Sequence, residues 1–314
     1  MTELRSEMII RPAQPGDRAA LEAIAAQTWD GDDYLPRVLD EWLSDPNDGF
    51  FVADFRGRAV GVSKITRQGK GEWWLEGLRV DPAYRRAGVG RILHHFMLNQ
   101  LRQTGRGMVR YSTASDNQAS LRLGYETGFQ CVGIFRLYEA EPLHEPETRL
   151  AALGPGDLGR VRAWLDQSEV FARSQHGIEH EWVWLRLTDE RLAERLAAGL
   201  VYGWPGPQDD LAGVLIANGT EQHERYPENA LKLAYLDAAP DALEALGTAA
   251  RRLAAAQGRE WAGLKFPDWP ERAEILERAG WERAWDENVL LLQRDLNLTE
   301  QADVRVETLP SPPE

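Results

Sequence analysis

A strand, a turn rich in arginine and glycine, and a helix follow one another in the first third of the chain. Residues 85–90, Arg-Arg-Ala-Gly-Val-Gly, lie between a strand-like run at 73–80 and a helix-like run at 91–101. A turn of this kind leaves backbone N–H groups unpaired at the helix N-terminus, where the helix dipole attracts an anion. Gly88 and Gly90 let the backbone approach a pyrophosphate, and Arg85 and Arg86 add positive charge. The segment predicts a phosphate-binding loop.

Two other phosphate loops are excluded by the spacing. A Walker loop ends in Gly-Lys-Ser or Gly-Lys-Thr, and a dinucleotide-binding loop has the G-x-G-x-x-G pattern. Neither occurs at residues 85–90. The remaining alternative is a structural turn with a solvated basic face.

The string from Leu75 to Leu93, with its Arg-x-x-Gly-x-Gly spacing, resembles the acetyl-coenzyme A (acetyl-CoA) signature of the GNAT superfamily of N-acetyltransferases. The resemblance implies an α/β fold with a mixed, mostly antiparallel twisted sheet flanked by helices, and acetyl-CoA as cosubstrate. It also implies that strand residues pair with the pantetheine chain and that the next turn holds the pyrophosphate. The implied cofactor-binding residues are Leu78, Arg79, Val80, Arg85, Arg86, Ala87, Gly88, Val89, Gly90, Arg91 and Asn117. Asn117 is equally a candidate helix cap.

Hydrophobic periodicity gives an order of elements that also resembles the GNAT fold. The predicted strands are 8–11, 50–55, 58–65, 72–80 and 108–113, with one or two closing strands in 129–138. Arg56-Gly57 is typical of a hairpin turn. The predicted helices are 18–28, a second within 36–43, 91–101 and 117–127.

The second half of the chain repeats landmarks of the first, which predicts tandem GNAT folds. Pro155-Gly156-Asp157 lies 140 residues after Pro15-Gly16-Asp17, and Gly280 lies 152 after Gly128. Residues 231–237 match 75–81 at an offset of 156, so four residues are missing near the phosphate loop. Asp241 and Glu244 stand there instead, and we predict no cofactor in this half.

These comparisons divide the chain into four parts. We expect a catalytic domain at 1–141, a linker at 142–147, a degenerate GNAT-like domain at 148–296 and a mobile tail at 297–314. A length of 314 residues agrees with about two domains.

Composition excludes several classes of protein. A net charge of −14 argues against a nucleic-acid partner. No apolar run approaches the ~20 residues of a membrane helix, and the N-terminus has no signal-peptide character, so we predict a cytoplasmic protein. Cys131 is the single cysteine, and His176 and His180 stand four apart without a third ligand, so no metal is expected. A monomer and a homodimer both remain open.

Acetyl transfer to an amine needs a base, because an amine with a pKa of about 9 to 10 is mostly protonated at neutral pH. Strict alternation would place Glu72 and Glu76 on the strand face of Leu78 and Val80, with Glu76 nearer the thioester. Glu76 is the predicted base, and its alternative is an exposed or arginine-paired glutamate. The acids that could recognise a cationic acceptor are Asp30, Asp32 and Asp33, and the aromatic residues that could line its pocket are Trp29 and Trp74.

The proton donor departs from the family pattern. GNAT enzymes often carry a Leu-Tyr pair before the Gly-Phe, but here Leu123 is followed by Gly124, and Tyr125 comes one place late. One residue rotates a helical side chain by about 100°. Tyr125 is the named candidate, and a water, Tyr111 or no specific acid are its alternatives.

The sequence thus predicts an N-acetyltransferase that moves acetyl from acetyl-CoA to a primary amine of a small molecule by direct attack in a ternary complex. Residues 29–36 and 74–80 also resemble the histidine N-acetyltransferase-like branch, which implies an amino acid or amine acceptor. The alternatives are a non-catalytic acetyl-CoA binding or sensing protein and an enzyme that acetylates a peptide or protein amine.

Overall fold

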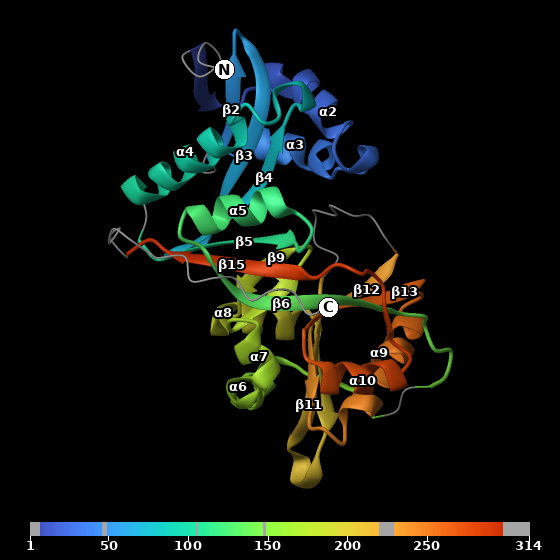
Figure 1. The fold of residues 1–314 in the computed structure, drawn as a ribbon. Coiled ribbons are helices and arrows are strands. Elements are labelled where there is room, and N and C mark those ends of the chain that lie inside the picture. Colours follow the sequence, from blue (N-terminus) through green and yellow to red (C-terminus); the bar gives the residue numbers. More distant parts are fainter. Residues whose placement is uncertain (1–6, 46–48, 105, 147–148, 220–228, 298–314) are drawn as a thin grey trace.

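The computed structural model describes residues 7–45, 49–104, 106–146, 149–219 and 229–297 (Figure 1). The first half contains β1 (Met8–Pro12), α2 (Arg18–Ala25), α3 (Leu35–Ser44), β2 (Gly49–Phe55), β3 (Arg58–Gly69), β4 (Glu72–Val80), α4 (Val89–Thr104), β5 (Met108–Ala114), α5 (Gln118–Glu126) and β6 (Gln130–Ala140). Short 3-10 turns precede α2, α3 and α4: η1 (Pro15–Asp17), η2 (Trp29–Gly31) and η3 (Pro82–Tyr84). The predicted elements of this half are all present, and β6 is a single closing strand.

The second half follows the same order with an insertion. It contains β7 (Ala151–Ala152), η4 (Pro155–Asp157), α6 (Leu158–Gln167), α7 (Glu169–Arg173), β8 (Gly177–His180), β9 (Val183–Arg186), α8 (Asp189–Ala197), β10 (Val201–Pro205), η5 (Pro207–Asp209), β11 (Leu211–Ala217), β12 (Ala230–Ala238), α9 (Leu243–Ala256), β13 (Trp261–Pro267), α10 (Pro270–Arg278), β14 (Glu282–Arg283) and β15 (Val289–Asp295). The inserted elements are α7 and the separate hairpin β8–β9. The predicted linker runs beside α9, where the Leu143 N–H donates to the Arg251 carbonyl, and the predicted tail lies outside the described residues from 298 onward.

In the described part of the chain, 13 strands form one sheet that contains both halves. Its order is β1-β2-β3-β4-β5-β15-β6-β13-β12-β11-β10-β7, with β14 beside β6. Counted inward from one edge of the sheet, the strands of the first half are β1, β2, β3, β4 and β5. Counted inward from the other edge, their counterparts in the second half are β7, β10, β11, β12 and β13. The two central strands are exchanged, because β15 from the second half pairs with β5, and β6 from the first half pairs with β13. Figure 1 shows β15 in red and β6 in green, side by side between the two lobes.

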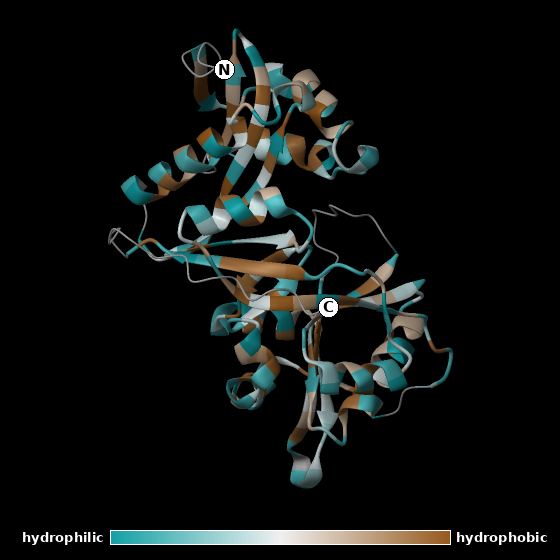
Figure 2. Ribbon diagram, viewed as in Figure 1, coloured by the Kyte–Doolittle hydropathy of each residue, from teal (hydrophilic) through white to brown (hydrophobic). Residues whose placement is uncertain are grey.

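The exchanged strands are part of the core. Val289, Leu291 and Leu292 of β15 are fully buried, and Figure 2 shows this strand as a hydrophobic band across the middle of the molecule. In the first half, α4 covers one face of the sheet and α3 the other. A Cβ on Gly61 would meet Val89 and Leu93 of α4, whereas a Cβ on Gly77 would meet Trp42 of α3.

The strand pairing corrects the sequence match between the halves. Gly61 pairs with Val80, and its counterpart Gly213 pairs with Ala238, so Val80 corresponds to Ala238 at an offset of 158 rather than 156. Gly280 corresponds to Gly128 at an offset of 152, and the two glycines have similar φ values of +84° and +82°. The offset thus falls from 158 to 152 between these points, so the second half lacks six residues rather than four. A shift of two keeps the side-chain alternation of a strand, so pattern matching could not detect the error.

His94 on α4 makes stability depend on pH. Its ring is buried and lies 2.9 Å from Thr127 Oγ1, and burial, with His95 and Arg294 nearby, lowers its pKa to about 4. The unfolded chain therefore binds more protons than the folded chain between about pH 6.5 and pH 4, so the free energy of unfolding falls as the pH drops through this window, by up to about 3 kcal/mol. We expect His94→Gln to flatten that part of the pH profile of the urea midpoint. The exposed His144, changed to Gln, is the control, and an equal slope in both variants would contradict the assignment.

Candidate active site

The strands β4 and β5 pair over a short length and then separate. Glu72, Trp73 and Trp74 pair in parallel with Met108, Val109 and Arg110, and no later β4–β5 pair occurs in the described residues. A bulge contributes to this opening: β4 carries one extra residue opposite Ser63, and Gly77 has a φ of +70°. Past Trp74, the backbone of residues 78–80 therefore faces an open gap toward β5.

The glycine turn lies at the open end of β4. Asp81 ends the strand and accepts the N–H of Ala83 at 2.9 Å, and the chain then passes through Gly88, with a φ of +92°, into α4. The first N–H groups of α4 have no carbonyl partner within the helix. A Cβ on Gly90 would meet only Val80, at 3.5 Å, so internal packing does not require this glycine. The turn can thus accept an anionic group.

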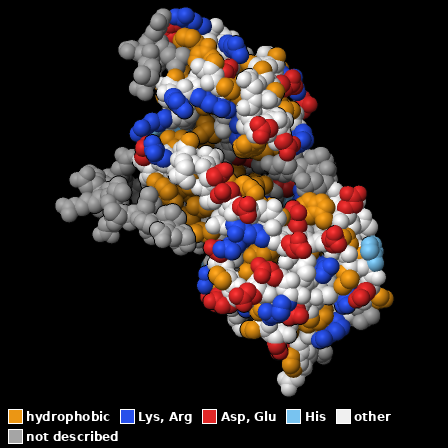
Figure 3. Space-filling view, turned by 45° about the vertical axis from the view of Figure 1, so that its right-hand side comes forward, with side chains coloured by type: hydrophobic (Ala, Val, Ile, Leu, Met, Phe, Trp, Pro, Cys, Tyr) orange, Lys and Arg blue, Asp and Glu red, His pale blue; other side chains and the backbone are white. Residues whose placement is uncertain are grey.

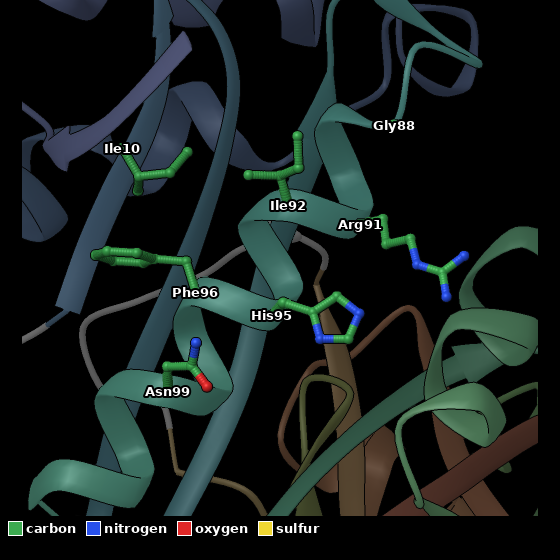
Figure 4. A pocket seen from close by; sticks show the side chains of 7 residues that line it. All are labelled: Ile10, Gly88, Arg91, Ile92, His95, Phe96 and Asn99. Carbon is green, nitrogen blue, oxygen red and sulfur yellow. The ribbon is translucent and has the colours of Figure 1, made fainter. Parts of the chain in front are cut away.

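Beyond this turn, Arg91 and His95 project from one side of α4, and Ile92 and Phe96 project from the other (Figure 4). A cavity of about 530 Å³ is lined by Ile10, Gly88, Arg91, Ile92, His95, Phe96 and Asn99. Arg91 and His95 point away from Ile10, and Arg91 pairs with Glu126 of α5 at 3.3 Å. Arg85 and Arg86 are exposed, and Arg85 reaches the carbonyl of Gln27 at 3.4 Å.

Arg79 faces away from the predicted cofactor side. Its guanidinium is buried, donates to Asp33 at 2.7 and 3.1 Å, and lies 4.2 Å from the centre of the Trp29 ring. Burial lowers the pKa of Arg79, but the neighbouring Tyr34 and Asp33 outweigh it, so the net direction is upward. Asp33 is therefore committed to an internal ion pair, which corrects its prediction as a loop acid for the acceptor, whereas Asp30 and Asp32 are exposed.

The bulge also corrects the predicted face of Glu76. In the strand register, Glu76 stands directly opposite Lys64, so the two side chains share a face of the sheet. The Lys64 ammonium lies 5.3 Å from the centre of the Trp42 ring, so this is the face that α3 covers. Leu78 packs with Val89 and Leu93 of α4 on the opposite face. The extra residue at the bulge reverses the alternation, which the sequence argument had assumed to be unbroken. Glu76 accepts a hydrogen bond from Thr66, and Glu72 pairs with Arg191 at 3.5 Å and Arg186 at 3.7 Å.

The Tyr111 hydroxyl occupies the space that a side chain at position 124 would need. A Cβ at position 124 would lie 2.0 Å from the Tyr111 hydroxyl, which donates to the Ser120 carbonyl at 3.0 Å. Burial raises the pKa of Tyr111 and also that of Tyr125. Tyr125 lies on the side of α5 near Cys131 of β6, and β15 separates β6 from β5. Tyr111 of β5 lies near both Tyr125 and Cys131, so the role of Tyr125 as the proton donor stays a prediction.

We expect Gly124→Ala to destabilise the protein by about 1–3 kcal/mol, because the new methyl group overlaps the Tyr111 hydroxyl. Tyr111→Phe removes that oxygen. The double variant should therefore lose less free energy of unfolding than the two single variants lose in sum. Urea unfolding of the four proteins measures this coupling. Strict additivity would show that the two residues do not share the space.

Two further sequence predictions concern single residues. Asn117 Oδ1 accepts the N–H of Ser120 at 3.2 Å, so Asn117 is a helix cap, and its contact with a cofactor stays a prediction. His180 ends strand β8 and His176 directly precedes it, so the two histidines do not lie on a helix. Among the described residues, no group of three or more His, Cys, Asp or Glu side chains could hold a metal, and no helix is long and apolar enough to cross a membrane.

In the second half, hydrogen-bonded side chains link β12 to α10 and to the start of α7 beyond the last β12–β13 pair. β12 and β13 pair in parallel only as far as Leu233 and Leu264. Beyond that point, the Tyr235 hydroxyl donates to Ser168 Oγ at 2.8 Å, and Ser168 donates to Asp237 at 2.6 Å. Arg272 of α10 pairs with Asp237 and donates to the Ala238 carbonyl at 2.9 Å. Burial raises the pKa of Asp237 despite these partners.

A splayed parallel strand pair, beside a glycine turn that leads into a helix N-terminus, defines an acetyltransferase of the GNAT type. Residues 18–129 match the model of the acetyltransferase (GNAT) family. The chain is 36% identical over 120 residues to N-alpha-acetyltransferase RimI of Mycobacterium tuberculosis, a match that covers 37% of this chain and 73% of that protein. The chain belongs to the GNAT family, which confirms the predicted enzyme class.

Other relatives agree on the family and the fold. The chain is 31% identical over 118 residues to the mycothiol acetyltransferase of Thermomonospora curvata, covering 37% of this chain and 38% of that protein. A GCN5-related N-acetyltransferase structure from Sphaerobacter thermophilus has a TM-score of 0.60 at 16% identity, covering 92% of this chain and 96% of the other. A tandem GNAT protein of the clavulanic acid biosynthesis pathway has a TM-score of 0.55 at 13% identity, covering 94% and 100%. These structures confirm the predicted fold class.

Proposed function

We propose that the chain transfers acetyl from acetyl-CoA to a primary amine of a small molecule by direct attack in a ternary complex. The observation that carries this proposal is the gap between β4 and β5, with an anion-binding helix N-terminus at its open end. The hairpin β8–β9 of the second half contacts β4 through Trp74 and β5 through Ser112 beside this gap, which supports a small acceptor. The histidine N-acetyltransferase-like resemblance remains a prediction that agrees with it.

Each part of the site has a role in the proposed reaction. Bound acetyl-CoA would supply the acyl thioester and a thiol leaving group. The backbone of residues 78–80 binds the pantetheine arm, and the N–H groups of residues 86–91 bind the pyrophosphate. Glu76, on the acceptor side of the sheet, takes the proton of the amine as its nitrogen bonds to the acetyl carbon and the C–S bond breaks. Tyr125 returns a proton to the sulfur, and a water, Tyr111 or no specific acid are its alternatives.

We further propose one cofactor site per chain, in the domain at 1–141, with 148–296 as a degenerate partner domain. The Arg272 side chain of α10 supports this, because it donates to the carbonyl of Ala238, the counterpart of Val80, whose backbone would pair with the pantetheine arm in the first half. A cytoplasmic location and the choice between monomer and homodimer stay predictions.

A peptide or protein N-terminus is the second candidate acceptor. The N-alpha-acetyltransferase named among the relatives favours it, since that match covers most of the relative's length. The two acceptor classes differ in size, so activity on free amines against activity on peptides separates them.

A thiol-release screen over amino acids, amines, polyamines, amino sugars and peptides tests the proposal, together with calorimetry of acetyl-CoA binding. Turnover on a small amine supports it, and turnover on peptides alone favours the second candidate. Binding without turnover on every acceptor would indicate a sensing protein, and no binding would reject the cofactor site.

We expect Glu76→Gln to lower kcat by about 100-fold near neutral pH, because the amide cannot take the proton. The loss should shrink as the pH rises, since more of the amine is then neutral in solution, while acetyl-CoA affinity stays unchanged. Glu72→Gln is the matched control on the same strand and should keep its kcat, because Glu72 is held by Arg186 and Arg191. Equal kcat values in both variants would remove Glu76 from the mechanism.

A further inference from the structure

The hairpin β8–β9 belongs to the second half but packs on the first. Trp184 of β9 is buried with Trp74 of β4 and Leu291 of β15. Arg186, at the other end of β9, pairs with Glu72. The hairpin therefore lies along the sheet face that carries Glu76, the face on which the acceptor must approach if Glu76 is the base.

The tip of the hairpin can be placed against the gap from the strand register. Trp74 pairs with Arg110, so two residues further along these parallel strands stand Glu76 on one side of the gap and Ser112 on the other. The Ser112 hydroxyl donates to the Trp182 carbonyl at 2.6 Å. The turn at Glu181 and Trp182 thus lies across the gap from Glu76.

The tip of the hairpin carries an aromatic surface, and the charged side chains beside it are paired with one another. The half-buried Trp182 ring meets Trp285 edge to face, with centres 5.7 Å apart. The Glu179 carboxylate accepts hydrogen bonds from the Lys265 ammonium at 2.7 Å and from the Trp182 backbone N–H at 2.6 Å. Glu181 lies 3.8 Å from the ammonium of Lys232. These pairs leave an aromatic wall with little net charge opposite Glu76.

We propose that this wall, Trp182 with Trp285, is the part of the acceptor site that determines specificity, and that it selects primary amines joined to an apolar or aromatic group. The inference rests on the proposed acetyltransferase function. Glu76 takes up the single ammonium, and the indole rings contact the apolar body of the acceptor. A second ammonium would be repelled by the ammonium of Lys265, which already lies 5.1 Å from the centre of the Trp182 ring, and the hydroxyl groups of a sugar would lose hydrogen bonds to water against the indole rings. Figure 3 shows the hollow between the two lobes, with hydrophobic side chains at its border.

The hairpin is part of a segment that is inserted in the second half and has no counterpart in the first. In the first half the connection between α2 and α3 is the short turn η2, whereas between α6 and α8 the chain inserts α7 and the hairpin. Ser168, which caps α7, donates to Asp237 of β12, and the hairpin that follows reaches the first gap through Ser112. One inserted segment thus contacts the sheets of both halves, and in the first half it lies beside the proposed acceptor site.

The test compares three amines in the full-length enzyme: 2-phenylethylamine, spermidine and glucosamine. We expect kcat/KM for 2-phenylethylamine to exceed the others by about tenfold or more, and Trp182→Ala to raise its KM about tenfold without changing acetyl-CoA affinity. Trp285→Phe, a milder change, should raise KM less and keeps the test open if the alanine variant does not fold. Tyr202→Ala on the distant strand β10 is the control for loss of a half-buried ring.

The outcomes separate this inference from the function on which it rests. If no amine is acetylated by the unaltered enzyme, the proposed function itself fails. If amines are acetylated but spermidine or glucosamine is preferred, or both tryptophan variants keep the original KM, the function stands and the aromatic wall is rejected.

Discussion

Gly88→Glu should abolish acetyl-CoA binding, with an affinity loss of about 100-fold or more, equivalent to about 3 kcal/mol. Gly88 has a φ of +92°, which only glycine adopts without strain, and it directly precedes the first turn of α4. A glutamate there brings a carboxylate against the N–H groups that would bind the pyrophosphate. The carboxylate repels the phosphates and occupies their partners. Isothermal titration with acetyl-CoA measures the loss directly.

The control must match both the charge and the backbone strain. Gly57, in the hairpin turn between β2 and β3, has a φ of +83° and open space where a Cβ would stand. Gly57→Glu should therefore keep the affinity of the unaltered protein, while Gly88→Ala should lose less than Gly88→Glu because it adds no charge. Unchanged affinity in a folded Gly88→Glu protein would place the pyrophosphate elsewhere.

Residues 1–141 expressed alone should fail to fold. Without the second half, β5 loses its neighbour β15, and β6 loses β15 and β13 together. Val289, Leu291 and Leu292 are fully buried, and each such side chain contributes about 1.5–3 kcal/mol. Three unpaired strand edges, one on β5 and two on β6, would also favour aggregation. We expect an insoluble fragment, or a soluble one without a cooperative unfolding transition by circular dichroism.

Co-expression of 1–141 with 142–314 is the matched experiment. The two fragments should form a 1:1 complex that binds acetyl-CoA, because every strand then recovers its neighbours. A full-length protein with a protease site inserted between 142 and 147 should stay associated after cleavage. A monomeric, folded fragment 1–141 with full acetyl-CoA affinity would show that the strand exchange is dispensable.

The elements that sequence predicted well are those with local causes. The Arg56-Gly57 turn, the strand at 72–80 and the helix after Gly88 follow from turn chemistry and periodicity within short windows. Asp17 and Asp157 each accept the N–H three residues before them, which is why the two Pro-Gly-Asp motifs were recognisable as copies.

The strand exchange could not be predicted, because the two copies carry equivalent closing strands. Local sequence shows that a strand follows α5 and that another follows α10, but either could fill the place beside β5. Only non-local packing decides between them. The hairpin β8–β9 was missed because its turn, at Glu181 and Trp182, has positive φ values of 48° and 72° without glycine or asparagine.

The candidate site divides in the same way. The glycine loop was located from sequence, whereas the face of Glu76 was assigned wrongly because one bulge reverses the alternation. Gly77 inside a strand was the available indication, since such glycines often mark bulges. Asp33 was interpreted as a loop acid because its partner Arg79 lies 46 residues away.

The position of β15 also fixes when the site can mature during protein synthesis. Residues 1–140 leave the ribosome first, yet the slot between β5 and β6 stays empty until residues 289–295 have emerged. The N-terminal lobe therefore waits for nearly the whole chain to be translated before its sheet is complete. A premature stop anywhere before β15 would leave this lobe incomplete even though every residue of the predicted acetyl-CoA loop is present.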